Sequence, residues 1–101
     1  MEVIAKSRER NLILELKGEL DHHAARQVML DIERELDATL PLRLTLDFAK
    51  VSFMDSSGIA VVLRTQRKML AVGGTLSVCA VPAQAKKVFD AAGIHRLVNM
   101  I

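Results

Sequence analysis

The feature that most constrains the fold is a regular alternation of short apolar runs with segments of helical periodicity. Residues 42–48 form an apolar run of strand length, and residues 59–72 follow with the apolar spacing of an amphipathic helix. The expected strands are 3–5, 11–16, 42–48, 75–81 and 96–101, and the expected helices are 22–39, 59–72 and 83–92. This order, β-β-α-β-α-β-α-β, predicts an α/β fold with a mixed, mostly parallel sheet of four to five strands.

Helix-capping and helix-breaking residues mark the boundaries between these segments. Asp21 is the predicted N-cap of the first helix, and Pro41 ends that helix. Pro82 opens the last helix and Gly93 ends it. No linker, repeat or low-complexity segment interrupts the pattern, so we expect residues 1–101 to form a single domain.

The composition argues against several classes of protein. Half of the 101 residues are apolar, enough for a core without disulfides, and the lone Cys79 lies in an apolar run that predicts a buried thiol. The longest apolar run is far shorter than the roughly 20 residues of a membrane span, and the N-terminus lacks a secretory-signal pattern. The net charge of +2 comes from interleaved basic and acidic residues, without the dense basic stripe typical of nucleic-acid binding. We therefore expect a cytoplasmic protein with no membrane contact and no direct nucleic-acid contact.

The strand-to-helix turn at residues 54–58, Met-Asp-Ser-Ser-Gly, is the candidate functional segment. A helix start offers unpaired backbone N–H groups and the positive end of the helix dipole, so a hydroxyl there can cap the helix, attack a substrate or carry a phosphate. Spacing alone favours capping by Asp55 or Ser56, and of the two serines Ser56 is the predicted N-cap. Because the carboxyl ends of parallel strands meet at one sheet edge, we expect residues 18–22, with Asp21, to lie beside this turn.

A small serine hydrolase and a nucleotide-binding domain are the alternatives that would use the same sheet edge. The serine turn lacks the leading glycine of a G-x-S-x-G nucleophile elbow, and only His22 and His23 are expected at that edge as bases. The chain has no G-x-x-x-x-G-K-[ST] phosphate loop. The two adjacent histidines would diverge by about 100° on a helix. No C-x-x-C or H-x-x-x-H pair exists, so we expect no metal and no cofactor.

Three segments resemble the anti-sigma factor antagonists of the STAS domain family, and most strongly their sporulation branch. They are Gly18–Ala25 (GELDHHAA), Val51–Ile59 (VSFMDSSGI) and Lys86–Ile94 (KKVFDAAGI). The Asp-Ser-Ser-Gly turn preceded by Ser-Phe-Met is the most specific part, and Leu-Asp-His-His adds weight toward the sporulation type. The resemblance runs from about residue 2 to the C-terminus and implies a single STAS domain over residues 1–101.

The resemblance implies a partner-switching regulator rather than an enzyme. In this family the unphosphorylated antagonist binds an anti-sigma factor serine kinase and displaces its sigma factor. The kinase phosphorylates a serine of the antagonist, which weakens binding, and a PP2C-type phosphatase reverses the step. The matching phosphoacceptor is Ser57. We expect a monomer when the protein is free, and a general-stress antagonist of the same family stays an alternative to the sporulation type. The residues implied for partner binding are Asp21, His22, Met54, Asp55, Ser56, Ser57, Gly58 and Ile59.

Overall fold

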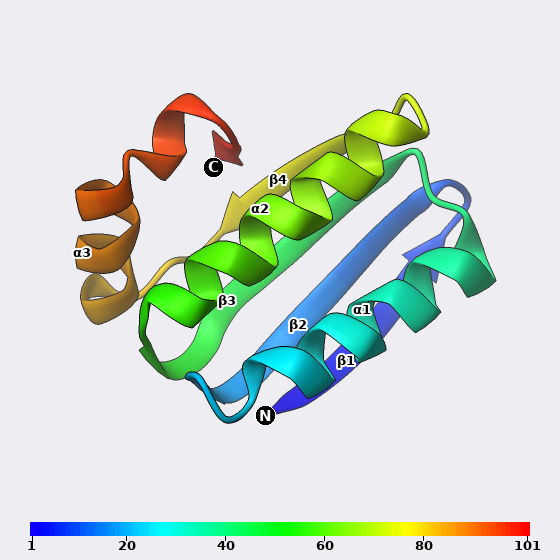
Figure 1. The fold of residues 1–101 in the computed structure, drawn as a ribbon. Helices are drawn as coiled ribbons and strands as arrows, with labels where there is room; N and C mark the ends of the chain where they lie inside the picture. The colour runs from blue at the N-terminus through cyan, green and yellow to red at the C-terminus, as the bar shows by residue number, and fades with distance from the viewer.

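The computed structural model describes residues 1–101 and contains one five-stranded sheet flanked by helices (Figure 1). The elements are β1 (Glu2–Arg8), β2 (Asn11–Leu20), α1 (Ala25–Thr39), β3 (Arg43–Met54), α2 (Ser56–Ala71), β4 (Thr75–Cys79), α3 (Ala83–Ala92), the short 3-10 helix η1 (Ile94–Arg96) and β5 (Asn99–Met100). The sheet order is β1-β2-β3-β4-β5, with β1 antiparallel to β2 and the other neighbouring strands parallel. The predicted element order and the mixed, mostly parallel sheet are confirmed.

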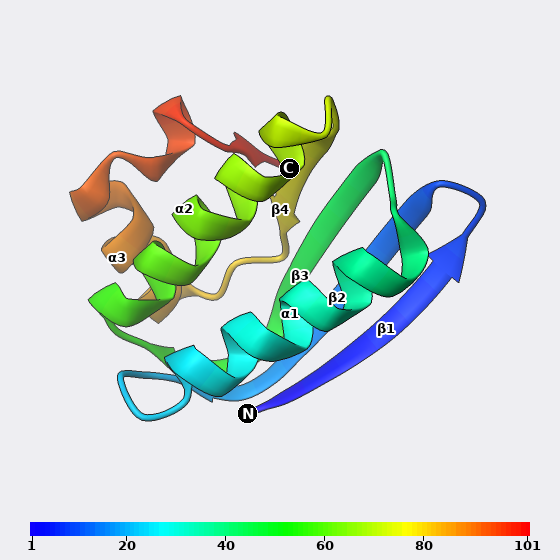
Figure 2. The ribbon, with the colours of Figure 1, turned by 45° about the vertical axis from the view of Figure 1, so that its right-hand side comes forward.

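Helices α1 and α2 lie side by side across one face of the sheet, and α3 lies beside the N-terminal part of α2 (Figures 1 and 2). Along β2, alternate residues point toward these helices, so that Leu12, Leu14 and Leu16 are buried while Ile13 between them is exposed. The helices complete the core with Val28, Ile32, Leu36, Val61, Val62, Met69, Ala85 and Phe89. None of the helices has the length and apolar character needed to cross a membrane.

Strands β2 and β3 are longer than predicted because each provides hydrogen-bond partners for the other. The segment Gly18–Leu20, predicted as a turn, continues β2 and pairs with the end of β3, where Glu19 lies opposite Phe53. The pairing shifts register between Gly18 and Glu19, and Gly18 has a φ of +115°, a backbone conformation that favours glycine. The irregular pairing lets both strands reach the edge that carries the serine turn.

Helix α1 begins at Ala25, later than the predicted start at His22. The Asp21 carbonyl oxygen accepts hydrogen bonds from the N–H groups of Ala24 and Ala25, at 3.2 and 3.0 Å. The Asp21 Oδ1 atom also accepts from the Ala24 N–H at 3.0 Å. Asp21 therefore caps a separate turn that precedes the helix, and the N-cap position of α1 itself is Ala24.

The structure corrects three further predictions. The apolar spacing of the predicted first helix continues to Leu40, but Leu40 is 65% exposed and forms the left-handed C-cap of α1 with a φ of 47°. Cys79, expected to be buried, is half-buried, because its neighbour Val78 is the residue that points into the core. The predicted strand 96–101 is instead mostly irregular, and only the short β5 pairs with Ser77 and Val78.

Candidate functional site

The carboxyl ends of β2 and β3 meet at one edge of the sheet, as the parallel arrangement predicts. Leu20 and Met54 are the last paired residues, and the Asp55 N–H donates to the Leu20 carbonyl oxygen over 3.3 Å. The segments 18–22 and 54–58 therefore adjoin each other, next to the N-terminal ends of α1 and α2 (Figure 1). We refer to this region as the serine edge, made up of Asp21, His22, Asp55, Ser56 and Ser57.

The Asp55 carboxylate holds the two turns of the serine edge together. Its Oδ1 atom accepts the Ser57 N–H at 2.8 Å, which makes Asp55 the N-cap of α2. Its Oδ2 atom accepts the backbone N–H of His22 at 3.1 Å, from the neighbouring turn. The prediction that Ser56 caps this helix is wrong, because the side chain of Asp55 already occupies the cap position.

These hydrogen bonds lower the pKa of the Asp55 carboxyl below its ordinary value. The Ser57 backbone N–H has the largest effect, partial desolvation opposes it, and the backbone N–H of His22 lowers the pKa further. The charged carboxylate therefore stabilises the folded state fully above the ordinary carboxyl pKa of about 4. This contribution is lost as the pH falls through that value toward the lower pKa of the folded protein.

We expect the Asp55→Asn variant to be less stable than wild type at pH 7 and to approach it in stability below about pH 4. Asparagine caps a helix about as well as aspartate but carries no charge. The substitution therefore removes only the pH-dependent part of the contribution of Asp55 to the free energy of unfolding. The Asp55→Ala variant loses the cap as well and should be the least stable of the three at every pH. Urea unfolding between pH 3 and pH 7 measures this, and a wild-type advantage over Asp55→Asn that does not change with pH would contradict the assignment.

The other polar residues of the serine edge differ in exposure. Asp21 is half-buried, whereas His22 and His23 are exposed, with their rings packed edge to face at 5.7 Å. Ser56 is exposed and Ser57 is half-buried. The structure contains no hydrogen bond between either serine hydroxyl and a histidine, and no group of three or more His, Cys, Asp or Glu side chains placed to hold a metal.

Two of the residues implied for partner binding are buried in this structure. Met54 is fully buried, and Gly58 is buried directly against it. A Cβ atom placed on Gly58 would come within 2.6 Å of the Met54 Sδ atom and 3.1 Å of a Leu20 methyl group. The motif therefore needs glycine at position 58 so that α2 can start close to the ends of both strands. Ile59 is half-buried and packs against the core.

Two residues near the serine edge were missed by the sequence analysis. Gln84 of α3 accepts the Met54 N–H with Oε1 and donates to the Met54 carbonyl oxygen with Nε2, both at 2.8 Å. Phe53 is 43% exposed next to the serine turn. A single glutamine on a distant helix carries no spacing signal, but an aromatic residue on the outward side of a strand end could have been recognised as a candidate contact.

The mixed sheet with its covering helices is a fold found in known proteins. The chain belongs to the STAS domain family, whose model matches residues 2–101. It is similar to the anti-sigma F factor antagonist of Paenibacillus polymyxa, with 30% identity over 86 residues, which cover 85% of this chain and 74% of that protein.

Solved structures show the same likeness. The unphosphorylated form of the anti-sigma factor antagonist SpoIIAA has 28% sequence identity and a TM-score of 0.83, over 99% of this chain and 88% of that one. The phosphorylated form of the Bacillus cell fate determinant SpoIIAA has 28% identity and a TM-score of 0.74, over 99% of this chain and 91% of that one. The fold is thus shared with a protein whose structure is known in both phosphorylation states.

Proposed function

We propose that this protein is an anti-sigma factor antagonist that acts by partner switching. In its unphosphorylated form it binds an anti-sigma factor serine kinase, which then releases its sigma factor. The observation that carries the proposal is the Asp55-capped serine turn at the exposed edge of a STAS domain. The similarity to SpoIIAA and to an anti-sigma F factor antagonist favours the sporulation type. In this role the protein is a single-domain binding module without a cofactor, a monomer when free, and not an enzyme.

Ser57 is the proposed phosphoacceptor. This assignment rests on its place as the second serine of the Asp-Ser-Ser-Gly motif. Capping does not distinguish the two serines, because Asp55 rather than Ser56 caps the helix. A phosphate at this position adds about −1.5 to −2 charges within the first turn of α2, where the helix dipole favours negative charge. The fold therefore tolerates the modification. The added charge mainly alters the affinity for a partner that binds at the serine edge.

The proposed partner surface consists of the serine edge together with two neighbouring side chains. Ile59 supplies half-buried apolar area, and the exposed ring of Phe53 supplies an aromatic contact of the kind enriched at protein interfaces. Met54 and Gly58 contribute by supporting the turn from below. A PP2C-type phosphatase would need access to the same edge in order to restore the binding form.

Treatment with an anti-sigma factor serine kinase and ATP tests the proposed function. We expect intact-mass analysis to show one phosphate per chain, peptide mapping to place it on Ser57, and the Ser57→Ala variant to remain unmodified. A PP2C-type phosphatase should then remove it. Turnover of a simple ester by the purified protein, abolished in Ser57→Ala, would instead favour the hydrolase alternative. Tighter binding to a general-stress kinase than to a sporulation kinase would favour the general-stress branch.

We expect the Asp21→Asn variant to fold normally and to bind the kinase more weakly than wild type does. Asparagine can keep the hydrogen bond to the Ala24 N–H but removes the charge that a partner at this edge would meet. The matched control is Asp37→Asn, an exposed position near the end of α1 that lies far from the serine edge. Calorimetry at one salt concentration measures the three affinities. Equal values for Asp21→Asn and wild type would show that the charge of Asp21 does not contribute to kinase binding.

A further inference from the structure

A groove of about 440 Å³ runs between α1 and α2, and Ser57 lines one end of it. The α2 wall includes Ser57, Ala60, Val61 and Arg64, which follow the i, i+3, i+4, i+7 spacing of one helical face. The α1 wall includes Arg26, Met29 and Glu33, which share a face in the same way. The proposed phosphoacceptor therefore lies in a channel that also contains two arginines from different helices.

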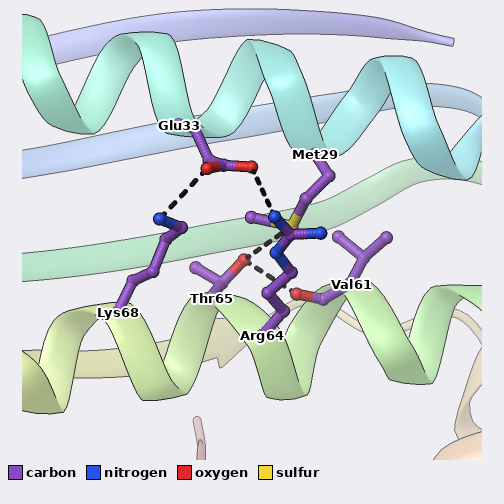
Figure 3. Close-up of polar contacts among 6 residues, drawn as sticks. All are labelled: Met29, Glu33, Val61, Arg64, Thr65 and Lys68. Atoms are coloured by element: carbon purple, nitrogen blue, oxygen red, sulfur yellow. Dashed lines mark hydrogen bonds and ion pairs between the residues drawn. The ribbon is translucent and has the colours of Figure 1, made fainter.

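Contacts between the two helices place Arg26 near Ser57. Glu33 of α1 forms ion pairs with Arg64 at 3.4 Å and with Lys68 at 3.0 Å, and Met29 Sδ lies 3.9 Å from Thr65 Oγ1 (Figure 3). The residue numbers of these contacts differ by 31, 35 and 36, so position 26 of α1 lies opposite about position 60 of α2. Position 60 lies three residues after Ser57, which is roughly one turn along the axis of α2 at a rise of about 1.5 Å per residue.

Both arginines are available to a new anion in the groove. Arg26 takes part in none of the ion pairs of the structure. Arg64 shares Glu33 with Lys68, which lies closer to that carboxylate, and the Arg64 side chain is 58% exposed. An exposed ion pair of this kind contributes little stability, so Arg64 can leave Glu33 at small cost. Helical side chains lean toward the N-terminus of their helix, which directs the Arg64 guanidinium back toward Ser57.

We propose that Arg26 and Arg64 form an intramolecular clamp that binds the phosphate of phosphorylated Ser57 within the α1–α2 groove. The proposal rests on Ser57 being the phosphoacceptor. Guanidinium groups bind phosphate oxygens through paired, charge-assisted hydrogen bonds, and here one comes from each wall of the groove. The clamp offsets the repulsion between the phosphate and the carboxylates of Asp55 and Glu33. It also ties α1 to α2 over Met29 and Val61.

The test uses phosphoserine placed at position 57 by translational incorporation, so that no kinase is needed. Titration followed by ³¹P NMR gives the second pKa of the phosphate, in the otherwise wild-type chain and in the Arg26→Gln, Arg64→Gln double variant. We expect this pKa to be lower with both arginines present, by at least about half a unit, because a nearby cation favours the dianion. Each single variant should show an intermediate value. The matched control is Arg67→Gln, which removes one positive charge from an exposed position of α2 outside the groove.

Equal pKa values in the double variant and the wild-type background would overturn the clamp. An Arg67→Gln shift as large as that of Arg64→Gln would also overturn it, because the effect would then be one of general charge. The two proposals fail separately. If a kinase modifies Ser57 while the arginines leave the phosphate pKa unchanged, the clamp is wrong and the proposed function stands. If the arginines lower this pKa but no anti-sigma kinase modifies the protein, the arginines bind a phosphate at position 57 and the proposed function is wrong.

Discussion

Phosphorylation of Ser57 will lower the affinity for the anti-sigma factor kinase by about a hundredfold or more. The phosphate adds about −1.5 to −2 charges to an edge that already carries the carboxylates of Asp21 and Asp55. Burying this charge in an interface without an opposite charge to pair with it costs several kcal/mol, and each 1.4 kcal/mol corresponds to a factor of ten in affinity. Calorimetry with the phosphorylated and unphosphorylated proteins measures the difference.

Two controls separate this effect from unfolding. The phosphorylated protein should keep its circular dichroism spectrum and melt within a few degrees of the unmodified form, since the helix dipole accommodates the charge. The Ser57→Ala variant should bind the kinase about as tightly as unphosphorylated wild type, with or without ATP. An affinity for the kinase that does not change on phosphorylation would show that phosphorylation does not control binding. Loss of secondary structure would show that phosphorylation acts by unfolding the protein.

The Phe48→Ala variant will lower the free energy of unfolding by about 3–5 kcal/mol, the usual cost of removing a buried aromatic ring. Phe48 of β3 is fully buried, and its ring packs edge to face on that of Phe89 from α3, with centroids 5.4 Å apart. Because single domains are typically stable by only 5–15 kcal/mol, this variant should be marginally folded at 37 °C. The loss should loosen α3 in particular, together with the Gln84 contacts to Met54.

The matched control for this prediction is Phe53→Ala, which makes the same chemical change at a side chain that is 43% exposed. Its effect on unfolding should be well below that of Phe48→Ala, because less apolar surface leaves the protein interior and no core cavity forms. Urea denaturation of both variants gives the comparison. Similar losses for the two would show that the Phe48–Phe89 pair does not anchor α3.

Local patterns were sufficient for the fold class and for the position of the serine edge. Strands such as β2 alternate buried and exposed residues, and α1 and α2 repeat apolar residues at helical spacing, so these elements could be recognised from their own segments. Consecutive strands joined by a helix usually lie parallel and side by side in the sheet, which brings the ends of β2 and β3 together. The position of the motif 54–58 could also be predicted, because the strand before it and the helix after it are both recognised from local patterns.

Features that depend on partners distant in sequence were decided only by the tertiary structure. The Asp55 carboxylate joins two turns, because its second oxygen also accepts the backbone N–H of His22, 33 residues away in sequence. The two long strands extend past their predicted ends because each completes the hydrogen bonds of the other.

Tertiary packing also decided which residues lie together at the serine edge and in the groove. Met54 is covered because Gln84 of α3 and Gly58 of α2 close over it. Arg26 and Ser57 share a groove only because packing sets the register of α1 against α2. Hydrophobic periodicity determines which face of an element is buried, but it carries no information on which residue of another element lies opposite. By itself the sequence therefore determined the elements and the edge at which they meet, and packing in three dimensions decided which side chains touch there.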